Sequence, residues 1–306
     1  MGTFIAGDWG TSNLRLWLCR DGQVLDRAEG PGVAAVPGRV EAAFMEATAA
    51  WRDAHGPLPA LFCGMVGSSI GWVEAVYQPC PADVRSLASG LTRFKAAGAE
   101  MAIIPGLSTT NPQGAPDVMR GEETQILGAL ATKPELRQGR RLLCLPGTHA
   151  KWVLLEDGTV RHFQTGFSGE LFALLRQHSV LGRGTDGLQP QAGAAFDRGV
   201  ERALTKAALP HLLFEARSRQ LLEGMTAQDA LSFLSGLVIG ADVAGGLAGV
   251  SGDLDGPVTL VASPVLTDAY AAALRVAGQD AACLDGADLA LAGLFSVHTN
   301  SLSSKA

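Results

Sequence analysis

The amino-terminal segment has the hydrophobic pattern of two consecutive β-hairpins. An apolar run from Phe4 is interrupted by a turn at Gly10, and a second apolar run ends at the pair Asp21-Gly22 before Val24. An Asp-Gly pair between two apolar runs is typical of the tight turn of a hairpin. We therefore expect a strand, a glycine turn, a strand, an Asp-Gly turn and a third strand.

The same pattern returns in the second half of the chain. An apolar run is interrupted by a Gly-Thr pair at 147–148, and the next run ends at an Asp-Gly pair at 157–158. In both copies a tryptophan follows the Gly-Thr pair, seven or five residues later, and Asp-Gly follows eleven or ten residues later. Apolar residues at helical spacing come next, at 39–55 and at 169–181. This repeated spacing predicts an internal duplication, with a chance match of two hairpins as the alternative.

Helices are expected between further strands, which is the pattern of an α/β protein. The expected strands are 59–66, 102–105 and 258–262, and the expected helices are 122–131, a long helix after the N-cap Thr226, and 268–277 after a loop at 263–266. We expect two similar domains, over 1–135 and 136–296, followed by a polar tail over 297–306.

Composition and charge exclude several classes of protein. The chain has 306 residues, of which 47% are hydrophobic and 18% charged, so it can bury a large core and lacks the composition of a disordered chain. Its net charge of −6 argues against nucleic acid or an anionic membrane surface as a partner. We expect a small-molecule partner, no nucleic acid and no membrane, and the sequence is compatible with a homodimer.

The cysteines and the apolar segments favour a cytoplasmic location. The five cysteines are odd in number and form no C-x-x-C pair, so we expect free thiols in a reducing compartment. No secretory signal is expected, since the first apolar stretch is cut by Asp8. The uncharged stretch 54–73 contains Pro57, Pro59 and four glycines, which argue against a membrane helix.

The first glycine turn contains groups that can bind phosphate. Asp8 ends the first predicted strand and is followed by Gly10, Thr11 and Ser12, whose backbone N–H groups and hydroxyls can converge on an anion. A carboxylate at this position can also hold Mg²⁺, directly or through water. An ordinary hairpin turn is the alternative interpretation.

The second glycine turn strengthens the phosphate interpretation, because two such hairpins can hold one polyphosphate from opposite sides of a cleft. It contains Gly147, Thr148 and His149, and Lys151 beside it supplies a cation for the same anion. A solvated surface lysine is the alternative interpretation of Lys151.

An arginine, a glycine and two glutamates lie at the start of a predicted helix. Either Glu122 or Glu123 can accept the proton of an attacking hydroxyl, while Arg120 neutralises charge on the substrate or transition state. The structural alternative is that the helix dipole stabilises carboxylates in its first turn. Farther along, Arg176 and Arg183 are seven residues apart, so they either share a helix face that binds an anion or point into solvent.

Five sequence blocks occur in an order that is specific as a set, although no single block would suffice. They are GDWGTSNLR at 7–15, GMVGS at 64–68, MRGEETQ at 119–125, PGTHAKW at 146–152 and TGFSGELF at 165–172. With these blocks the chain resembles the 2-dehydro-3-deoxygalactonokinases, small members of the sugar kinase and actin-like ATPase superfamily. The resemblance extends from about residue 4 to residue 296.

The resemblance implies two ribonuclease-H-like domains around an ATP cleft. It also implies a reaction in which ATP and Mg²⁺ phosphorylate the 6-hydroxyl of 2-dehydro-3-deoxy-D-galactonate, giving the 6-phosphate and ADP in galactonate catabolism. By position, Asp8 and 10–12 match the first phosphate motif and 147–149 the second. Ser263, Pro264 and Leu266 match the nucleotide-side segment, with Tyr270 following.

The chain departs from the superfamily pattern in two places. It lacks the double glycine that many members have before the adenosine helix. Leu145-Pro146 also stand where an aspartate often occurs in the second hairpin. Asp8 is therefore the one strand-end carboxylate that we expect near the metal.

The resemblance also ranks the catalytic and substrate-binding candidates. The Glu-Glu pair is similar to the catalytic segment of the exopolyphosphatase branch, which favours Glu123 over Glu122 as the base, with Asp8 as a rival. An anionic keto acid needs donors, and the candidates are Asn13, Arg15, Arg120 and Arg176.

Three other functions stay open from the sequence. The chain could phosphorylate another sugar acid, or the glutamate could activate water as in an exopolyphosphatase. A non-catalytic sugar sensor is a third reading, although no basic helix-turn-helix segment accompanies the repeat. ADP formation without a sugar acid would distinguish hydrolysis from phosphorylation.

Overall fold

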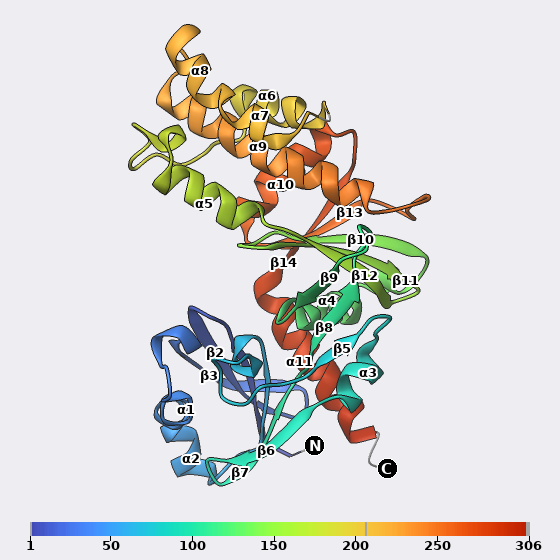
Figure 1. Ribbon diagram of the computed structural model, residues 1–306. Coiled ribbons are helices and arrows are strands. Elements are labelled where there is room, and N and C mark those ends of the chain that lie inside the picture. The colour runs from blue at the N-terminus through green and yellow to red at the C-terminus, as the bar shows by residue number, and fades with distance from the viewer. Residues whose placement is uncertain (1, 206, 304–306) are drawn as a thin grey trace.

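The computed structural model describes residues 2–205 and 207–303 and has a layered architecture of helices and β-sheets (Figure 1). The first large sheet consists of β1 (Phe4–Trp9), β2 (Asn13–Arg20), β3 (Gln23–Pro31), β4 (Ala60–Cys63), β6 (Thr92–Ala96) and β7 (Ala99–Ile103). The second consists of β10 (Arg140–Leu145), β11 (Ala150–Glu156), β12 (Thr159–Gly166), β13 (Val258–Ala262) and β14 (Ala281–Asp285). The prediction of a mixed α/β protein is confirmed.

The two large sheets share one topology, which confirms the predicted duplication. Their spatial orders are β3-β2-β1-β4-β7-β6 and β12-β11-β10-β13-β14. Each sheet begins with a meander of three antiparallel strands. A fourth strand, β4 or β13, pairs in parallel with the first strand of the meander, and a fifth, β7 or β14, pairs in parallel with the fourth. The first sheet adds β6 antiparallel to β7.

The two meanders also match in local detail. Asp21 and Asp157 have positive φ angles of 51° and 48°, and each is followed by a glycine with positive φ, as a type I′ hairpin turn requires. The pairing register shifts between Leu18 and Cys19 in the β2–β3 pair and between Leu154 and Leu155 in the β11–β12 pair. Both irregularities lie at the same distance from the Asp-Gly turn, so the repeat includes its bulge.

Two helices form the central layer between the large sheets. They are α4 (Glu122–Thr132) and α11 (Gly286–Ser303), which pack against each other, and α11 also contacts β1, β4 and β13 (Figure 1). A Cβ on Gly128 would lie 1.9 Å from the backbone oxygen of Leu289, and one on Gly293 would lie 1.9 Å from that of Thr124. Glycine therefore permits the close approach of the two helices. One buried core joins both sheets through this layer.

Helices also cover the outer face of each large sheet. On the first sheet these are α1 (Val40–Ala47) and α2 (Ala49–His55), which bury Phe44 and Trp51. On the second they are α6 (Ala194–Leu204), α9 (Ala227–Ala248) and α10 (Pro264–Val276). Helix α9 has the length and hydropathy of a membrane span, but 72% of its apolar window is buried and it packs along α6, as expected for a core helix.

A third, small sheet lies beside the second large sheet. It consists of β5 (Tyr77–Pro79), β8 (Gly106–Thr110) and β9 (Pro116–Met119), in the order β5-β8-β9. Strands β8 and β9 contact β12, and Ala82 forms an isolated bridge with Val160. The last strand of this sheet leads through Arg120 and Gly121 directly into α4.

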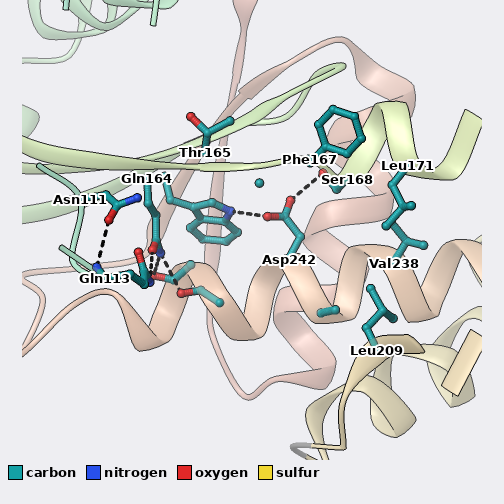
Figure 2. A pocket seen from close by; sticks show the side chains of 15 residues that line it. Asn111, Gln113, Gln164, Thr165, Phe167, Ser168, Leu171, Leu209, Val238 and Asp242 are labelled. Carbon is teal, nitrogen blue, oxygen red and sulfur yellow. Dashed lines mark hydrogen bonds between the residues drawn. The ribbon is translucent and has the colours of Figure 1, made fainter. Parts of the chain in front are cut away.

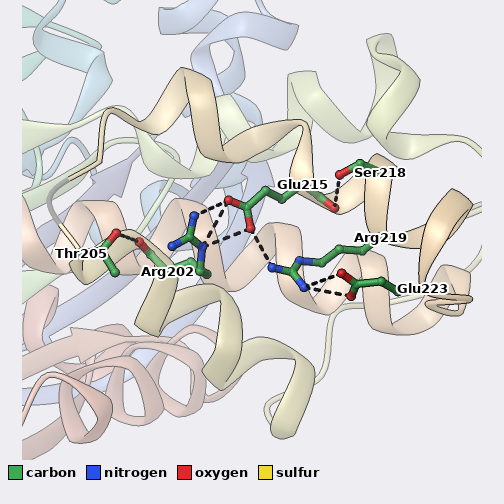
Figure 3. Close-up of polar contacts among 6 residues, drawn as sticks. All are labelled: Arg202, Thr205, Glu215, Ser218, Arg219 and Glu223. Atoms are coloured by element: carbon green, nitrogen blue, oxygen red, sulfur yellow. Dashed lines mark hydrogen bonds and ion pairs between the residues drawn. The ribbon is translucent and has the colours of Figure 1, made fainter.

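The remaining helices are short or peripheral. They are α3 (Val84–Ser89), α5 (Ser168–His178), α7 (Leu209–Leu213) and α8 (Glu215–Leu222), with 3₁₀ turns η1 (Val33–Ala35), η2 (Met65–Gly67), η3 (Pro134–Arg137) and η4 (Val180–Gly182). A chain of ion pairs joins α6 to α8, in which Glu215 accepts from Arg202 and Arg219, and Arg219 also binds Glu223 (Figure 3). All five cysteines are free.

Several expected boundaries differ from the structure. The segment 39–55 forms two helices that meet at Thr48, and α9 begins after the N-cap Thr226 as expected but continues to Ala248. The expected loop at 263–266 is wrong, because Pro264 begins α10 at a first-turn position that suits proline. The polar tail is wrong over 297–303, since α11 continues to Ser303 and Val297 is fully buried. Residues 304–306 lie outside the described residues.

Candidate active site

The first glycine turn closes β1 and opens into a cavity. The backbone N–H of Gly10 donates to the Asn13 oxygen at 2.9 Å, and a Cβ on Gly32 would lie 2.2 Å from the Thr11 oxygen, so the turn is tightly held. Thr11, Ser12 and Asn13 are exposed. They line a cavity of about 530 Å³ together with Asp8 and Gly10. The structure therefore brings the predicted residues of the first turn together around one open space.

Asp8 is held by two side chains. Its Oδ2 accepts a hydrogen bond from Arg15 Nη2, and the Cys63 thiol lies 3.7 Å from its Oδ1. Burial and the negative charge of Asp8 raise the pKa of the Cys63 thiol, so this thiol stays protonated and can donate. Arg15, predicted to bind the substrate, is paired with Asp8 here.

The two glutamates at the start of α4 occupy different environments. Glu122 lines a second cavity of about 190 Å³, which we call the Glu122 cavity, together with Asp8, Gly10 and Arg120. Glu123 is 1% exposed, and its carboxylate accepts from the backbone N–H of Gly121 at 2.6 Å and from the Thr124 hydroxyl at 3.0 Å. Only one of the two carboxylates therefore faces the space that contains Asp8.

The pKa values of both glutamates are raised, chiefly by burial. Burial and repulsion from Glu122 raise the pKa of Glu123 to about 8, against the opposing effect of its hydrogen bonds. Burial also raises the pKa of Glu122, and the positive charges of Lys151 and His149 lower it in part. A carboxylate with a raised pKa is a better proton acceptor once ionised than an ordinary surface glutamate.

Arg120 enters the same cavity with unpaired donors. Its Nη2 donates to the Ala75 oxygen at 2.7 Å, and its guanidinium lies 4.3 Å from the centre of the Tyr77 ring. Its Nε and Nη1 are buried, and within the described part of the chain neither has a hydrogen-bond partner. Buried charged donors without an acceptor cost free energy, so the site is suited to an anionic ligand or an ordered water.

The second glycine turn is braced by α5. The backbone N–H of Glu170 donates to the Thr148 oxygen at 2.9 Å, and a Cβ on Gly169 would lie 2.2 Å from the Gly147 oxygen. His149 is exposed at the tip, where its Nε2 lies 2.6 Å from a Glu170 carboxylate oxygen. The turn 147–149 and the first turn of α5 are therefore one unit.

Lys151 lies inside the molecule instead of beside the turn. It is 6% exposed, and its Nζ donates to the Val118 oxygen at 3.1 Å and to the Thr165 hydroxyl at 2.9 Å. The Thr165 hydroxyl and backbone N–H both donate to the carboxylate of Asp117. This network joins β11 and β12 to β9, the strand that leads to Arg120.

An apolar cavity of about 370 Å³ lies next to the second turn. Its wall includes Gly147, Phe172, Leu266 and Tyr270. Of the three predicted nucleotide-side residues, Leu266 lines this cavity, whereas Ser263 is the N-cap of α10 and Pro264 its first residue. Ser263 and Pro264 thus position the helix that carries Leu266 and Tyr270.

Arg176, expected as a substrate-binding candidate, does not line the Glu122 cavity. Its Nη2 donates to the Leu188 oxygen and its Nη1 lies 3.4 Å from the Gln189 side-chain oxygen. The guanidinium instead holds the loop that follows α5, because Arg176 is near the carboxyl end of that helix.

Among the described residues, no three His, Cys, Asp or Glu side chains group as a metal site. Mg²⁺ does not need such a group in a phosphotransferase, since one or two carboxylates, water and the substrate's phosphates complete its coordination. Asp8 offers hard oxygen donors beside a turn of exposed N–H groups, and Glu122 lines the same cavity. The residues present therefore fit this ion.

One polar cluster near the apolar cavity was not predicted. The carboxylate of Asp242 on α9 accepts from Trp152, Ser168 and Tyr270. Asp242 is the one charged residue between Asp229 and Asp253 in an otherwise uncharged helical stretch, and this isolation is the signal that could have identified it.

Comparison with known proteins places these features in a family context. Residues 8–297 match the family described as 2-keto-3-deoxy-galactonokinase. The chain is 41% identical over 300 residues to the "Probable 2-dehydro-3-deoxygalactonokinase DgoK1" of Rhizobium meliloti (strain 1021), covering 96% of this chain and 95% of that one. It is 38% identical over 298 residues to the 2-dehydro-3-deoxygalactonokinase of Escherichia coli (strain K12), covering 96% and 97%.

Solved structures agree with the fold. A crystal structure of a "putative 2-dehydro-3-deoxygalactonokinase protein" from Sinorhizobium meliloti superimposes with a TM-score of 0.88 at 38% identity, covering 96% of this chain and 97% of that one. An activator of the 2-hydroxyisocaproyl-CoA dehydratase from Clostridium difficile, solved with bound ADPNP, has a TM-score of 0.50 at 11% identity, covering 99% and 97%. The second likeness shows a shared fold only.

Proposed function

This chain belongs to the 2-keto-3-deoxy-galactonokinase family, and we propose that it transfers the γ-phosphoryl group of ATP to the 6-hydroxyl of 2-dehydro-3-deoxy-D-galactonate. The products are 2-dehydro-3-deoxy-6-phosphogalactonate and ADP. The observation that carries the proposed mechanism is the Glu122 cavity, where Asp8, Arg120 and Glu122 meet the first glycine turn.

We propose that ATP lies between two ribonuclease-H-like units, over 1–135 and 136–296. The adenosine occupies the apolar cavity, whose wall of Phe172, Leu266 and Tyr270 suits an aromatic base. Because Gly147 belongs to the same wall, the phosphates extend along 147–149 toward the first glycine turn, where Thr11 and Ser12 are exposed.

We propose that Asp8 holds Mg²⁺ with the phosphates of ATP. The ion, when bound, neutralises charge on the phosphates and the leaving ADP. Asp8 would hold the ion beside Arg15, whose guanidinium contacts one of the two carboxylate oxygens. Asn13 and Arg15, on β2 directly after the turn, line the cavity of about 530 Å³ and can donate to the substrate.

Glu122 is the proposed base. As a carboxylate it accepts the proton of the 6-hydroxyl, and the oxygen of that hydroxyl forms the new bond to the γ-phosphorus while the bond to the leaving ADP oxygen breaks. Glu123 holds the start of the helix instead, since its carboxylate is occupied by Gly121 and Thr124. This choice reverses the preference for Glu123 that came from the resemblance.

Arg120 is the proposed anion-binding residue. Its Nε and Nη1 are buried and free of protein partners within the described chain, and it lines the cavity that contains the proposed base. The substrate carboxylate or the transferring phosphoryl group would complete these hydrogen bonds.

The partners proposed for this enzyme are small molecules, ATP and a sugar acid, and the proposed location is the cytoplasm. The free cysteines and the burial of α9 in the core support this location. A homodimer is part of the proposal, and sedimentation of the purified protein tests it.

The test is ADP release by the purified protein with Mg-ATP and one of three acceptor conditions: the galactonate-derived keto acid, its gluconate epimer, or none. The proposal expects release with the galactonate acid, a large loss in Glu122→Gln, and a rate within a few-fold of wild type in Glu123→Gln. Release that does not depend on an acceptor would mean hydrolysis. Faster release with the epimer would reassign the substrate.

A further inference from the structure

Asp242 is a partly buried carboxylate that three different elements contact. Trp152 on β11 donates from Nε1 at 3.1 Å, Ser168 at the start of α5 donates from Oγ at 2.9 Å, and Tyr270 on α10 donates from its hydroxyl. Figure 2 shows the Asp242 carboxylate hydrogen-bonded to Ser168 among the residues that line a neighbouring cavity of about 310 Å³. Since α9 supplies Asp242 itself, four elements converge at one carboxylate.

The surroundings of Asp242 are built for it. A Cβ on Gly166 would lie 1.9 Å from its Oδ1, so glycine at this position makes room for the carboxylate. Burial raises the pKa of Asp242, and the hydrogen bonds from Tyr270, Ser168 and Trp152 oppose that rise. A carboxylate in an apolar helix is expensive to bury, so its donors are required to keep it there.

Two of the three donors lie on the wall of the apolar cavity. Ser168 and Tyr270 both line it, and their hydroxyls are also 3.0 Å from each other. Trp152 does not line this cavity and belongs to the neighbouring one. Asp242 itself lines the neighbouring cavity, and Ser168 lines both. Through its hydrogen bonds to Ser168 and Tyr270, Asp242 therefore holds polar atoms on the wall of the cavity that we assign to the nucleotide.

Ser168 connects Asp242 to the second glycine turn. It is the first residue of α5, and two residues later the N–H of Glu170 donates to the Thr148 oxygen. Gly169, between them, lies against the Gly147 oxygen. A change in the position of Ser168 would move both the helix start and the turn.

We propose that Asp242 is a positioning residue for nucleotide binding, which holds the Ser168 and Tyr270 hydroxyls so that the apolar cavity and the turn 147–149 are preformed for ATP. The inference rests on the proposed function only in assigning the apolar cavity to the nucleotide. Preformation matters because each group that must be ordered on binding reduces affinity.

The test is the dissociation constant of Mg-ATP, measured by calorimetry without any acceptor. Asp242→Ala is expected to weaken ATP binding by about tenfold or more, since two hydroxyls lose a charged acceptor. Asp242→Asn keeps one oxygen acceptor and the size of the side chain, so it is expected to stay within about threefold of wild type. The KM for the sugar acid should change less than about twofold in both variants, because the proposed site of the acceptor is the Glu122 cavity.

Two further variants keep the proposal testable if Asp242→Ala does not fold. The double variant Ser168→Ala with Tyr270→Phe leaves Asp242 in place and is expected to weaken ATP binding by about fivefold or more. Trp152→Phe removes the third donor without altering the apolar cavity wall and is the matched control, expected within about twofold.

Either of two results would overturn the inference. One is an ATP affinity that stays within about twofold in the double variant while the melting temperature falls, which is a purely structural role. The other is a loss of affinity in Trp152→Phe as large as in Asp242→Ala. If wild type binds ATP but phosphorylates no sugar acid, the proposed function fails while this test still applies.

Discussion

The two hairpins of this protein share an antiparallel strand pairing, and one of the cross-strand pairs at which they differ separates their chemistry. In the first, Asp8 lies opposite Arg15, and in the second Leu145 lies opposite Lys151. Both basic residues stand at the same distance from the Asp-Gly turn of their hairpin. Asp8 gives Arg15 an acidic partner at an open cavity, whereas Leu145 offers none, and Lys151 turns inward to Val118 and Thr165.

This difference teaches that the duplicated scaffold does not duplicate the chemistry. The first copy has the carboxylate of Asp8 on the wall of the Glu122 cavity, which suits a metal and the reacting groups. The second copy has an apolar strand end and a turn braced by α5 beside the apolar cavity, which suits a nucleotide. The basic residue at this position forms a partly exposed ion pair in the first copy and two buried hydrogen bonds in the second.

The sharpest way to separate the two copies is to remove the proposed base on the acceptor side. Glu122→Gln is expected to lower kcat by about a hundredfold or more, because a positioned base contributes at least that factor. ATP affinity should change little, since the apolar cavity that we propose for the nucleotide lies beside the second glycine turn. Steady-state kinetics with Glu123→Gln as the matched control checks this, and an equal loss in both variants would show that helix geometry, not proton transfer, was lost.

Removing the Arg120 guanidinium should weaken binding of the sugar acid and leave binding of the nucleotide unchanged. Arg120→Met is expected to raise the KM of the sugar acid by about tenfold or more, because a charge-assisted hydrogen bond is lost. Arg120→Lys should recover only part of the loss, since a point charge cannot replace the planar fork. An unchanged KM for the acid with a raised KM for ATP would move Arg120 to the phosphate side.

The two matched basic residues should differ in their effect on stability. Lys151→Met removes two buried hydrogen bonds and is expected to lower the free energy of unfolding by about 1–3 kcal/mol. Arg15→Met breaks a pair whose arginine is about one-third exposed and should cost less than about 1 kcal/mol. Urea denaturation of both variants measures the two losses of unfolding free energy. Equal losses would contradict the expected difference between the buried lysine and the partly exposed arginine.

Lys151 also makes a separate prediction for the pH profile. Its charge lowers the pKa of Glu122, so Lys151→Met should move the acidic limb of kcat/KM to higher pH. The other groups facing Glu122 are Asp8, Arg120, Glu123 and His149, which the variant leaves in place. Lys151→Arg retains the charge and should keep the wild-type limb. If the acidic limb does not move in Lys151→Met, the charge of Lys151 does not act on the proposed base Glu122.

A final prediction concerns Glu123 and the pH dependence of stability. Its pKa in the folded protein is raised to about 8 from 4.5. Between these values the folded state holds a proton that the unfolded state has lost, so stability contributed by this group falls as pH rises through that window. The slope is at most about 1.4 kcal/mol per pH unit. Glu123→Gln should flatten the curve from pH 5 to 8, and an unchanged slope would contradict the buried acid.

The fold was predictable where the evidence is local in sequence. The Asp-Gly turns, the glycine turns and the apolar runs of both hairpins encode their own geometry, and the N-cap Thr226 marks its helix. Other features depend on distant partners. The sequence around Val297 predicts a polar tail, but in the structure α11 packs between the two large sheets and Val297 is buried. Pro264 reads as a loop residue, although proline also suits the first turn of a helix.

The site follows the same division. The sequence places Asp8, Arg120 and Glu122 near motifs, but only the packing of α4 distinguishes Glu122, which faces the cavity, from its buried neighbour Glu123. The inward turn of Lys151 depends on Val118, a residue of another sheet. The local sequence does not determine which side chain faces the cavity or turns inward, because tertiary contacts determine both.

The most direct test of the asymmetry between the hairpins is a paired measurement on Asp8→Asn: kcat with Mg-ATP and sugar acid, and the affinity for ATP without metal. The account predicts that kcat falls by about a hundredfold or more while metal-free ATP binding stays within about twofold, because the second hairpin and the apolar cavity hold the nucleotide. A variant that keeps kcat, or that loses metal-free ATP affinity as steeply as kcat, would contradict it.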